Sequence, residues 1–137
     1  MALPFLDTNV LLRHLLQDHP EQSPRCTAFL RRMERGEMRV RTAETVVFEV
    51  VFTLQRQYGI PRAEIRDQVL PLMELPGIVL PGKRHLRRVF DLYVELNLSF
   101  VDAYHAVLMR RLKMDRILSF DKGLDRVPGI TRIEPER

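Results

Sequence analysis

Apolar and polar positions recur along the chain with two periods, one typical of strands and one typical of helices. Short continuous or alternating apolar runs predict β-strands, and these are expected at residues 3–7, 38–42, 78–80, 116–119 and 131–133. Between them, apolar residues recur every three or four positions, which predicts helices. The helices are expected at residues 8–17, 20–36, 43–58, 61–75, 83–97 and 99–113, and a turn is expected at residues 121–125.

Strands that alternate with helices predict an α/β fold with a mostly parallel sheet and right-handed crossovers. Gly36 and Gly59 are placed to end the second and third helices, and Ser99 to cap the start of the sixth. Pro71 is expected to kink or end the fourth helix. Because no linker, repeat or low-complexity segment interrupts the pattern, residues 1–137 are expected to form a single domain.

The helix expected at residues 43–58 has two apolar sides. One is a continuous stripe of Val46, Val47, Val50, Val51 and Leu54, bordered by a polar line of Thr45, Glu49 and Thr53. Phe48 and Phe52 project on the opposite side. Two apolar sides imply two packing partners, of which one is the core and the other is either a neighbouring helix or a second subunit.

Acidic residues stand inside four of the apolar segments, whereas most other acids of the chain have polar neighbours. Asp7 ends the first strand, Glu49 lies in the third helix, Asp102 opens the sixth, and Asp121 follows the strand at residues 116–119. A carboxylate in apolar surroundings is costly unless a partner compensates its charge. Carboxylates that converge repel one another, and they either take up protons or bind a cation. Ligands that are all oxygen favour Mg²⁺ or Mn²⁺.

Each of these acids also has a purely structural interpretation. Asp7 can cap the helix that follows it, Ser99 and Asp102 fit a capping box, and Asp121 can be a turn residue. Glu49 can be a half-exposed side chain on a helix. The joint occurrence of the four acids, more than any one of them, favours a metal site.

Composition adds a possible class of ligand. The chain is 45% hydrophobic and 29% charged, as in soluble globular proteins, and its net charge is +4, with arginine supplying almost all of the positive charge. Arginine suits phosphate because its planar fork donates two parallel hydrogen bonds, although an arginine-rich surface can equally reflect genome composition. No apolar run of 18 residues and no signal-peptide pattern are present, so we expect a cytoplasmic protein with no membrane partner. The lone Cys26 cannot form an internal disulfide.

With these four acids in order, the chain resembles the PIN domain, and more closely the VapC-type ribonuclease toxins of toxin–antitoxin pairs. The resemblance covers nearly the whole chain and rests on four motifs in order. They are Asp7-Thr8-Asn9, Glu49 within a valine-rich helix, Asp102 within residues 98–103, and Ser119-Phe120-Asp121. It implies a three-layer fold in which a mostly parallel central sheet is flanked by helices.

The resemblance also implies an activity. The chain would be a metal-dependent endoribonuclease whose catalytic and metal-binding residues are Asp7, Glu49, Asp102 and Asp121, with Mg²⁺ or Mn²⁺ as the cofactor. Ser119 would help to position metal or water, and cleavage would leave 5′-phosphate and 3′-hydroxyl ends.

Further details follow from the same family. Asn9 would orient Asp7, and Leu124 stands near the place where the family often has a phenylalanine. The expected partners are single-stranded or looped RNA, a cognate antitoxin protein and a second copy of the chain, with the Phe48 and Phe52 side of the third helix as a candidate dimer contact. Arg13, Arg110 and Arg111 are candidates for holding the RNA backbone.

Two other functions are compatible with parts of the pattern. A non-catalytic RNA- or protein-binding module of the same fold would keep the arginine surface without needing all four acids. A phosphoryl-transfer enzyme with Asp7 as nucleophile would be favoured by a second aspartate two residues on, where Asn9 stands. His105, three residues from Asp102, can lie near the site, but a solvated or core histidine is the simpler interpretation.

Overall fold

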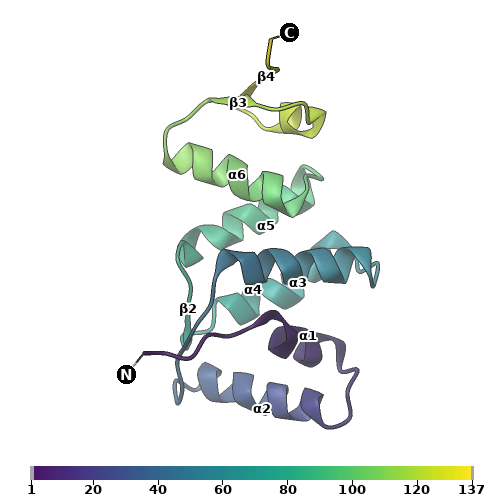
Figure 1. Ribbon diagram of the computed structural model, residues 1–137, viewed down its shortest axis with the longest axis vertical. Coiled ribbons are helices and arrows are strands. Elements are labelled where there is room, and N and C mark those ends of the chain that lie inside the picture. The colour runs from purple at the N-terminus through teal and green to yellow at the C-terminus, as the bar shows by residue number, and fades with distance from the viewer. Residues whose placement is uncertain (1, 137) are drawn as a thin grey trace. The chain divides into compact units, whose positions relative to one another are not determined.

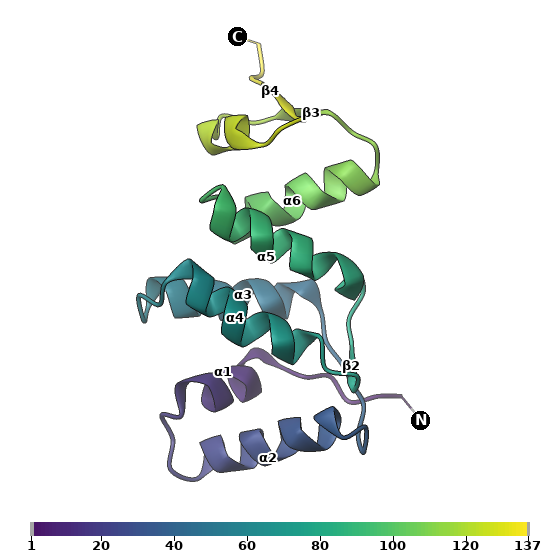
Figure 2. The same ribbon diagram turned by 180° about the vertical axis from the view of Figure 1, so that it is seen from behind.

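The computed structural model describes residues 2–136, which form two compact units. The N-terminal unit ends at Lys83, and the C-terminal unit begins at Arg84. Figure 1 and, from behind, Figure 2 show the helices and strands of each unit. The α/β fold with parallel strand pairing that the sequence predicts is confirmed.

The N-terminal unit combines helices with a short parallel pair of strands. Its elements are α1 (Thr8–Leu16), α2 (Gln22–Glu34), β1 (Val40–Arg41), α3 (Glu44–Arg56), α4 (Arg62–Met73) and β2 (Ile78–Val79). In sequence order, α1 packs against α2 and α3, and α3 packs against α4. The core lies between these helices, where the side chains of Met33, Val50, Leu54, Ile65 and Met73 are fully buried.

Strand β1 lies between two parallel neighbours. On one side it pairs with β2, and the amide of Val40 donates to the carbonyl of Gly77 at 2.8 Å. On the other side it meets the extended segment before α1, through a parallel bridge between Phe5 and Arg41. The strand predicted at residues 3–7 is therefore present as an extended segment held by one bridge, directly before α1.

The valine stripe of α3 is buried, as predicted, whereas on the opposite side Phe48 is half-buried and Phe52 faces outward. Phe52 is 61% exposed, and the guanidinium of Arg56 lies over its ring at 5.7 Å from the ring centroid. The face of α3 that carries Phe52 is thus open in the single chain, and its predicted second packing partner stays a prediction.

The C-terminal unit has the same mixture on a smaller scale. The 3₁₀ turn η1 (Lys83–His85) begins at the last residue of the N-terminal unit and leads into the C-terminal one. The elements of the C-terminal unit are α5 (Leu86–Glu95), α6 (Phe100–Arg111), β3 (Arg116–Leu118), the 3₁₀ helix η2 (Lys122–Arg126) and β4 (Thr131–Ile133). Helices α5 and α6 pack against each other, and β3 pairs with β4 in parallel. Rings of Phe90, Tyr93 and Phe100 fill the space between the two helices, with the centroids of Phe90 and Phe100 at 4.8 Å.

Several elements differ from the sequence prediction in extent or kind, among them the strand expected at residues 38–42, which is limited to Val40–Arg41. The turn expected at residues 121–125 is the 3₁₀ helix η2, which begins after Asp121. The helix expected from residue 83 opens as η1 and becomes α-helical at Leu86. Pro71 does not end its helix, since α4 continues to Met73. A proline in the last turn costs only one intrahelical hydrogen bond, and this one faces solvent.

No helix within residues 2–136 is long and apolar enough to cross a membrane.

Candidate active site

The backbone just before Asp7 is held to the end of β1 by both the amide and the carbonyl of Leu6. The amide of Leu6 donates to the carbonyl of Arg41 at 2.8 Å, and the hydroxyl of Thr42 donates to the carbonyl of Leu6 at 2.9 Å. Thr42 is buried, so its hydroxyl bond is shielded from competition with water. These bonds fix the point at which the extended segment ends and Asp7 begins α1, which is the position that the sequence predicted for this acid.

Thr8 connects Asp7 with Glu49. The carboxylate of Asp7 accepts a hydrogen bond from the amide of Thr8 at 2.8 Å and thereby caps α1. The hydroxyl of Thr8, which is buried, donates to Glu49 Oε2 at 2.9 Å. Two acids that are 42 positions apart in the sequence thus contact the same residue: Asp7 binds the main chain of Thr8, and Glu49 binds its side chain. The sequence singled out both acids but gave no sign that Thr8 joins them.

The C-terminal unit contains the second pair of acids. Asp102 lies in the first turn of α6, where its amide donates to the hydroxyl of Ser99 at 3.1 Å, so the predicted capping interaction is present. Asp121 lies between β3 and η2, and its Oδ1 accepts from the amide of Gly123 at 2.9 Å. The carboxyl groups of Asp102 and Asp121 are hydrogen-bonded to each other.

These two carboxyls titrate differently because their surroundings differ. Burial raises the pKa of Asp102, and the hydrogen bond to Asp121 and the charge of that residue raise it further, against smaller opposing effects of Ser99 and His105. The amide of Gly123 and then the bond to Asp102 lower the pKa of Asp121, helped by the charges of nearby arginines. Asp102 therefore takes up a proton more readily than Asp121 does. The arrangement is that of two acids which repel each other unless a cation or a proton lies between them.

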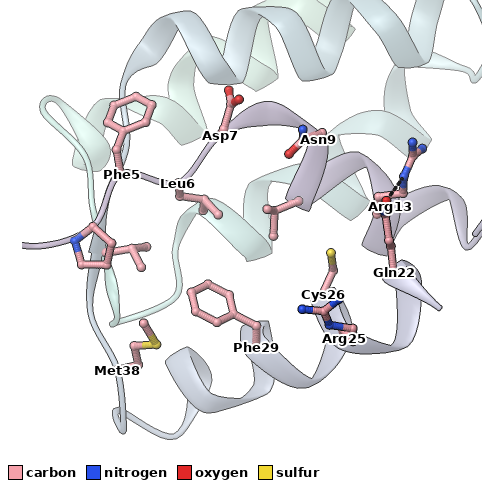
Figure 3. Close-up of a pocket in the computed structure, with 13 residues that line it drawn as sticks. Phe5, Leu6, Asp7, Asn9, Arg13, Gln22, Arg25, Cys26, Phe29 and Met38 are labelled. Atoms are coloured by element: carbon pink, nitrogen blue, oxygen red, sulfur yellow. Dashed lines mark hydrogen bonds between the residues drawn. The ribbon is translucent and has the colours of Figure 1, made fainter.

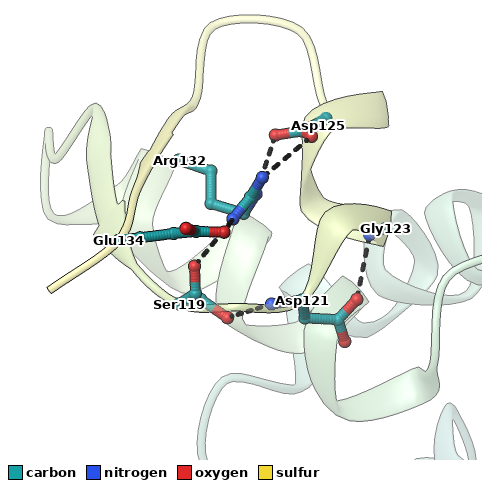
Figure 4. Close-up of polar contacts among 6 residues, drawn as sticks. All are labelled: Ser119, Asp121, Gly123, Asp125, Arg132 and Glu134. Atoms are coloured by element: carbon teal, nitrogen blue, oxygen red, sulfur yellow. Dashed lines mark hydrogen bonds and ion pairs between the residues drawn. The ribbon is translucent and has the colours of Figure 1, made fainter.

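Ser119 and Arg132 hold the segment that carries Asp121 (Figure 4). The hydroxyl of Ser119 accepts from the amide of Asp121 at 3.0 Å, and the carbonyl of Ser119 accepts from the guanidinium of Arg132 at 3.0 Å. The same guanidinium binds Asp125 at 3.0 Å and Glu134 at 2.8 Å. With only 12% of its side chain exposed, Arg132 joins β4, η2 and the end of β3. Sequence reasoning missed Arg132, whose one signal was a charge inside the short apolar strand at residues 131–133.

The acids themselves are more exposed than their apolar sequence neighbours suggested. Asp7, Glu49 and Asp121 are exposed and Asp102 is half-buried. Asp7 stands between the buried Leu6 and Thr8, whereas Phe120, directly before Asp121, is itself 70% exposed. His105 is exposed, and its charge acts on Asp102. Each unit brings two acids together, and within residues 2–136 no group of three histidine, cysteine, aspartate or glutamate residues that could hold a metal ion occurs.

The basic candidates lie at helix ends. Arg13 lies in the last turn of α1, where it hydrogen-bonds Gln22 at 3.0 Å and pairs with Asp18 at 3.3 Å. Arg110 and Arg111 lie in the last turn of α6 and are exposed. All three are therefore available at the surface to a polyanion, although Arg13 must exchange an exposed ion pair to bind one.

Comparison with known families decides the identity of the fold. The family model of the PIN domain matches residues 5–130, which is most of the chain. The chain belongs to the PIN domain family. PIN domains are generally nucleases, and they commonly use divalent metals. The match starts two positions before Asp7, includes all four predicted acids and Ser119, and extends over both units. No curated protein matches the chain.

Proposed function

We propose that this PIN domain protein is a metal-dependent endoribonuclease that hydrolyses RNA phosphodiester bonds. Its metal-binding and catalytic residues would be Asp7, Glu49, Asp102 and Asp121, and residues 1–137 would act as one domain. The main support is the hydrogen-bonded pair of Asp102 and Asp121, whose mutual repulsion a cation would relieve. The PIN match across both units supports the single domain.

The chemistry of these residues suits a hard divalent cation. The four acids supply only oxygen donors. The raised pKa of Asp102 indicates that a positive charge between Asp102 and Asp121 would stabilise the ionised pair. Each unit supplies two of these carboxylates. When bound, Mg²⁺ or Mn²⁺ activates water and offsets the negative charge of the phosphate during hydrolysis.

The residues around the acids would keep them in place for this reaction. Thr8 would orient Glu49 through its hydroxyl, and Ser119 would restrain the amide of Asp121. Arg13, Arg110 and Arg111 would bind backbone phosphates, which makes binding weaker as salt rises. Single-stranded or looped RNA would be the substrate, because its bases are accessible for recognition.

The decisive test removes one charge without removing a hydrogen bond. Asp7→Asn keeps an oxygen that can accept from the amide of Thr8, so α1 stays capped while one metal-binding carboxylate is lost. Purified protein would be incubated with total RNA, with and without Mn²⁺, and the cut ends mapped. We expect Mn²⁺-dependent cuts with the parent and none with the variant.

A matched control is available in the same unit. Asp67→Asn changes an aspartate whose side chain is 67% exposed and pairs with the neighbouring Arg66, and it should leave cleavage unchanged. Full activity of Asp7→Asn would refute the proposed site. Mn²⁺ should also raise the melting temperature of the parent; a non-catalytic binding module of the same fold would show neither cleavage nor this metal-dependent stabilisation.

We further propose that the protein is the toxin of a toxin–antitoxin pair and acts as a homodimer. The support is the resemblance of its motifs to the VapC-type toxins and the outward-facing Phe52 on α3. A short open reading frame immediately upstream in the genome, and inhibition of cleavage by its product, would support the toxin assignment. Light scattering should give twice the mass of one chain, and Phe52→Glu should halve it.

A further inference from the structure

A pocket of about 530 Å³ opens beside Asp7 within the N-terminal unit (Figure 3). Its walls come from the extended segment before α1, from α1, from α2 and from the start of β1. The volume falls in the range of sites that hold one small ligand, roughly 300–1,000 Å³. Asp7 lies at its rim, so a ligand in the pocket would be adjacent to a proposed catalytic acid.

One side of the pocket is apolar. Phe29, Met38, Leu6 and Val10 line it. Figure 3 shows Phe29 and Met38 on the same side of the extended segment, with the ring of Phe5 on the other side. Phe29 is partly exposed, so its ring remains available for contact with a ligand. Such rings provide stacking surfaces that accept any nucleobase.

The other side of the pocket is polar and positively charged. Arg13, Gln22 and Arg25 stand there together with Asn9, as Figure 3 shows. Arg25 is exposed and makes no ion pair with another residue of the described chain, and both arginines act electrostatically on the thiol of Cys26 between them. Two guanidinium groups at one end of an apolar pocket match the shape of a molecule with a flat apolar part and an anionic part.

We propose that this pocket binds one nucleotide of the RNA next to the cleaved phosphate, with the base against Phe29 and Met38 and its phosphate at Arg25 and Arg13. The inference rests on the proposed ribonuclease function and adds a subsite to it. The separation of aromatic and cationic ends favours a nucleotide over an acidic peptide segment, whose charges and apolar groups are not confined to opposite ends. The amide of Asn9 is placed to hydrogen-bond the ribose or the edge of the base.

Cys26 makes the subsite measurable without any cleavage. It is the only cysteine of the chain, it lines the pocket and it is partly exposed. Burial raises the pKa of its thiol, so alkylation is slow enough for its rate to be followed. The full chain, kept in EDTA so that RNA stays intact, would be treated with N-ethylmaleimide in the presence of increasing single-stranded oligoribonucleotide.

We expect the oligoribonucleotide to slow alkylation of Cys26, and the same backbone without bases to protect it less. Arg25→Gln and Phe29→Leu should each weaken protection about tenfold in apparent Kd. Arg32→Gln serves as the control, since Arg32 is an exposed arginine of the same helix that does not line the pocket, and it should weaken protection far less. Melting curves of each variant would verify folding, and the exposed Arg25 can be changed without loss of core packing.

The outcomes separate the subsite from the catalytic proposal. Protection by RNA with no Mn²⁺-dependent cleavage would leave the subsite standing and remove the ribonuclease assignment. Cleavage of RNA that never protects Cys26, or protection unaffected by Arg25→Gln and Phe29→Leu, would overturn the subsite. Equal protection by a glutamate-rich peptide would also overturn it and would identify the pocket as a docking surface for an acidic partner.

Discussion

The hydroxyl of Thr8 allows a direct test of how Glu49 is positioned, because it donates a hydrogen bond to that carboxylate. Thr8→Val replaces this hydroxyl with a methyl group of similar size at a site that is 5% exposed. The substitution removes the 2.9 Å bond to Glu49 and leaves the amide of Thr8, and therefore the cap by Asp7, unchanged. Stability and activity should both respond, because the bond joins α1 to α3 and also orients a proposed catalytic acid.

The magnitude follows from the surroundings of the two partners. A hydrogen bond to a charged group contributes about 1.5–3 kcal/mol, and Glu49 is exposed and regains water when the bond is lost, so we expect a loss of about 1 kcal/mol. For 137 residues the entropy of unfolding is on the order of 0.3 kcal/mol/K, which makes this about 3 °C in Tm. Thr8→Ala should cost about 1 kcal/mol more, since it also removes a buried methyl group.

A double-mutant cycle isolates the bond from other effects. Urea unfolding of Thr8→Val, Glu49→Ala and the double variant should give a coupling energy of about 1 kcal/mol. Thr45→Val provides the control, because Thr45 is an exposed threonine of α3 one turn before Glu49, and its replacement should change the free energy of unfolding by less than about 0.5 kcal/mol. In the cleavage assay, Thr8→Val should lower kcat and leave the protein folded.

Two results would refute this reasoning. Additive effects of Thr8→Val and Glu49→Ala would show that the two side chains do not support each other. A Thr8→Val variant with the stability and the kcat of the parent would show that the hydrogen bond to Glu49 matters neither to the fold nor to the reaction.

Three further predictions concern the C-terminal unit and the turn before β2. Because the pKa of Asp102 is raised in the folded protein, the stability that this group contributes is present below its ordinary pKa of 3.8 and is lost as pH rises through the higher folded value. In EDTA at pH 7.5, Asp102→Asn should therefore resist urea better than the parent. A lower stability of the variant there would contradict the raised pKa. Arg132→Met should lower the melting temperature, because it removes a part-buried hydrogen bond to the Ser119 carbonyl and two ion pairs. An unchanged thermal melt would show that Arg132 does not hold these segments together. Gly77→Ala should be strongly destabilising, with little folded protein recovered on expression. The added methyl group would press on the carbonyl of Met38 and come within 2.9 Å of Cβ of Met33. A melting temperature equal to that of the parent would contradict the close packing at this turn.

Local patterns predicted the elements well because their signals are contained in neighbouring residues. Asp7 and Ser99 mark helix starts by capping chemistry, and both cap as expected. The valine stripe of α3 predicted its buried side. Pro71 was misleading because its effect depends on how near it lies to the end of α4 and on its exposure to solvent, neither of which the sequence states.

Contacts between elements were much harder to foresee. The acids were identifiable from their apolar sequence context, but their pairing was not. The bond from Thr8 to Glu49 depends on how α1 packs against α3, and the bond between Asp102 and Asp121 depends on the path of β3 after α6. Arg132 belonged to no motif, and its three partners become neighbours only when β4 pairs with β3.

Strand β4 has a practical consequence for anyone who trims this protein. The matched family segment stops at residue 130, one position before β4 begins. A fragment cut at that boundary would strip β3 of its parallel neighbour and discard the guanidinium that anchors the Ser119 carbonyl. Truncated versions should therefore retain residues through Glu134, and affinity tags at the C-terminus should be separated from β4 by a flexible spacer.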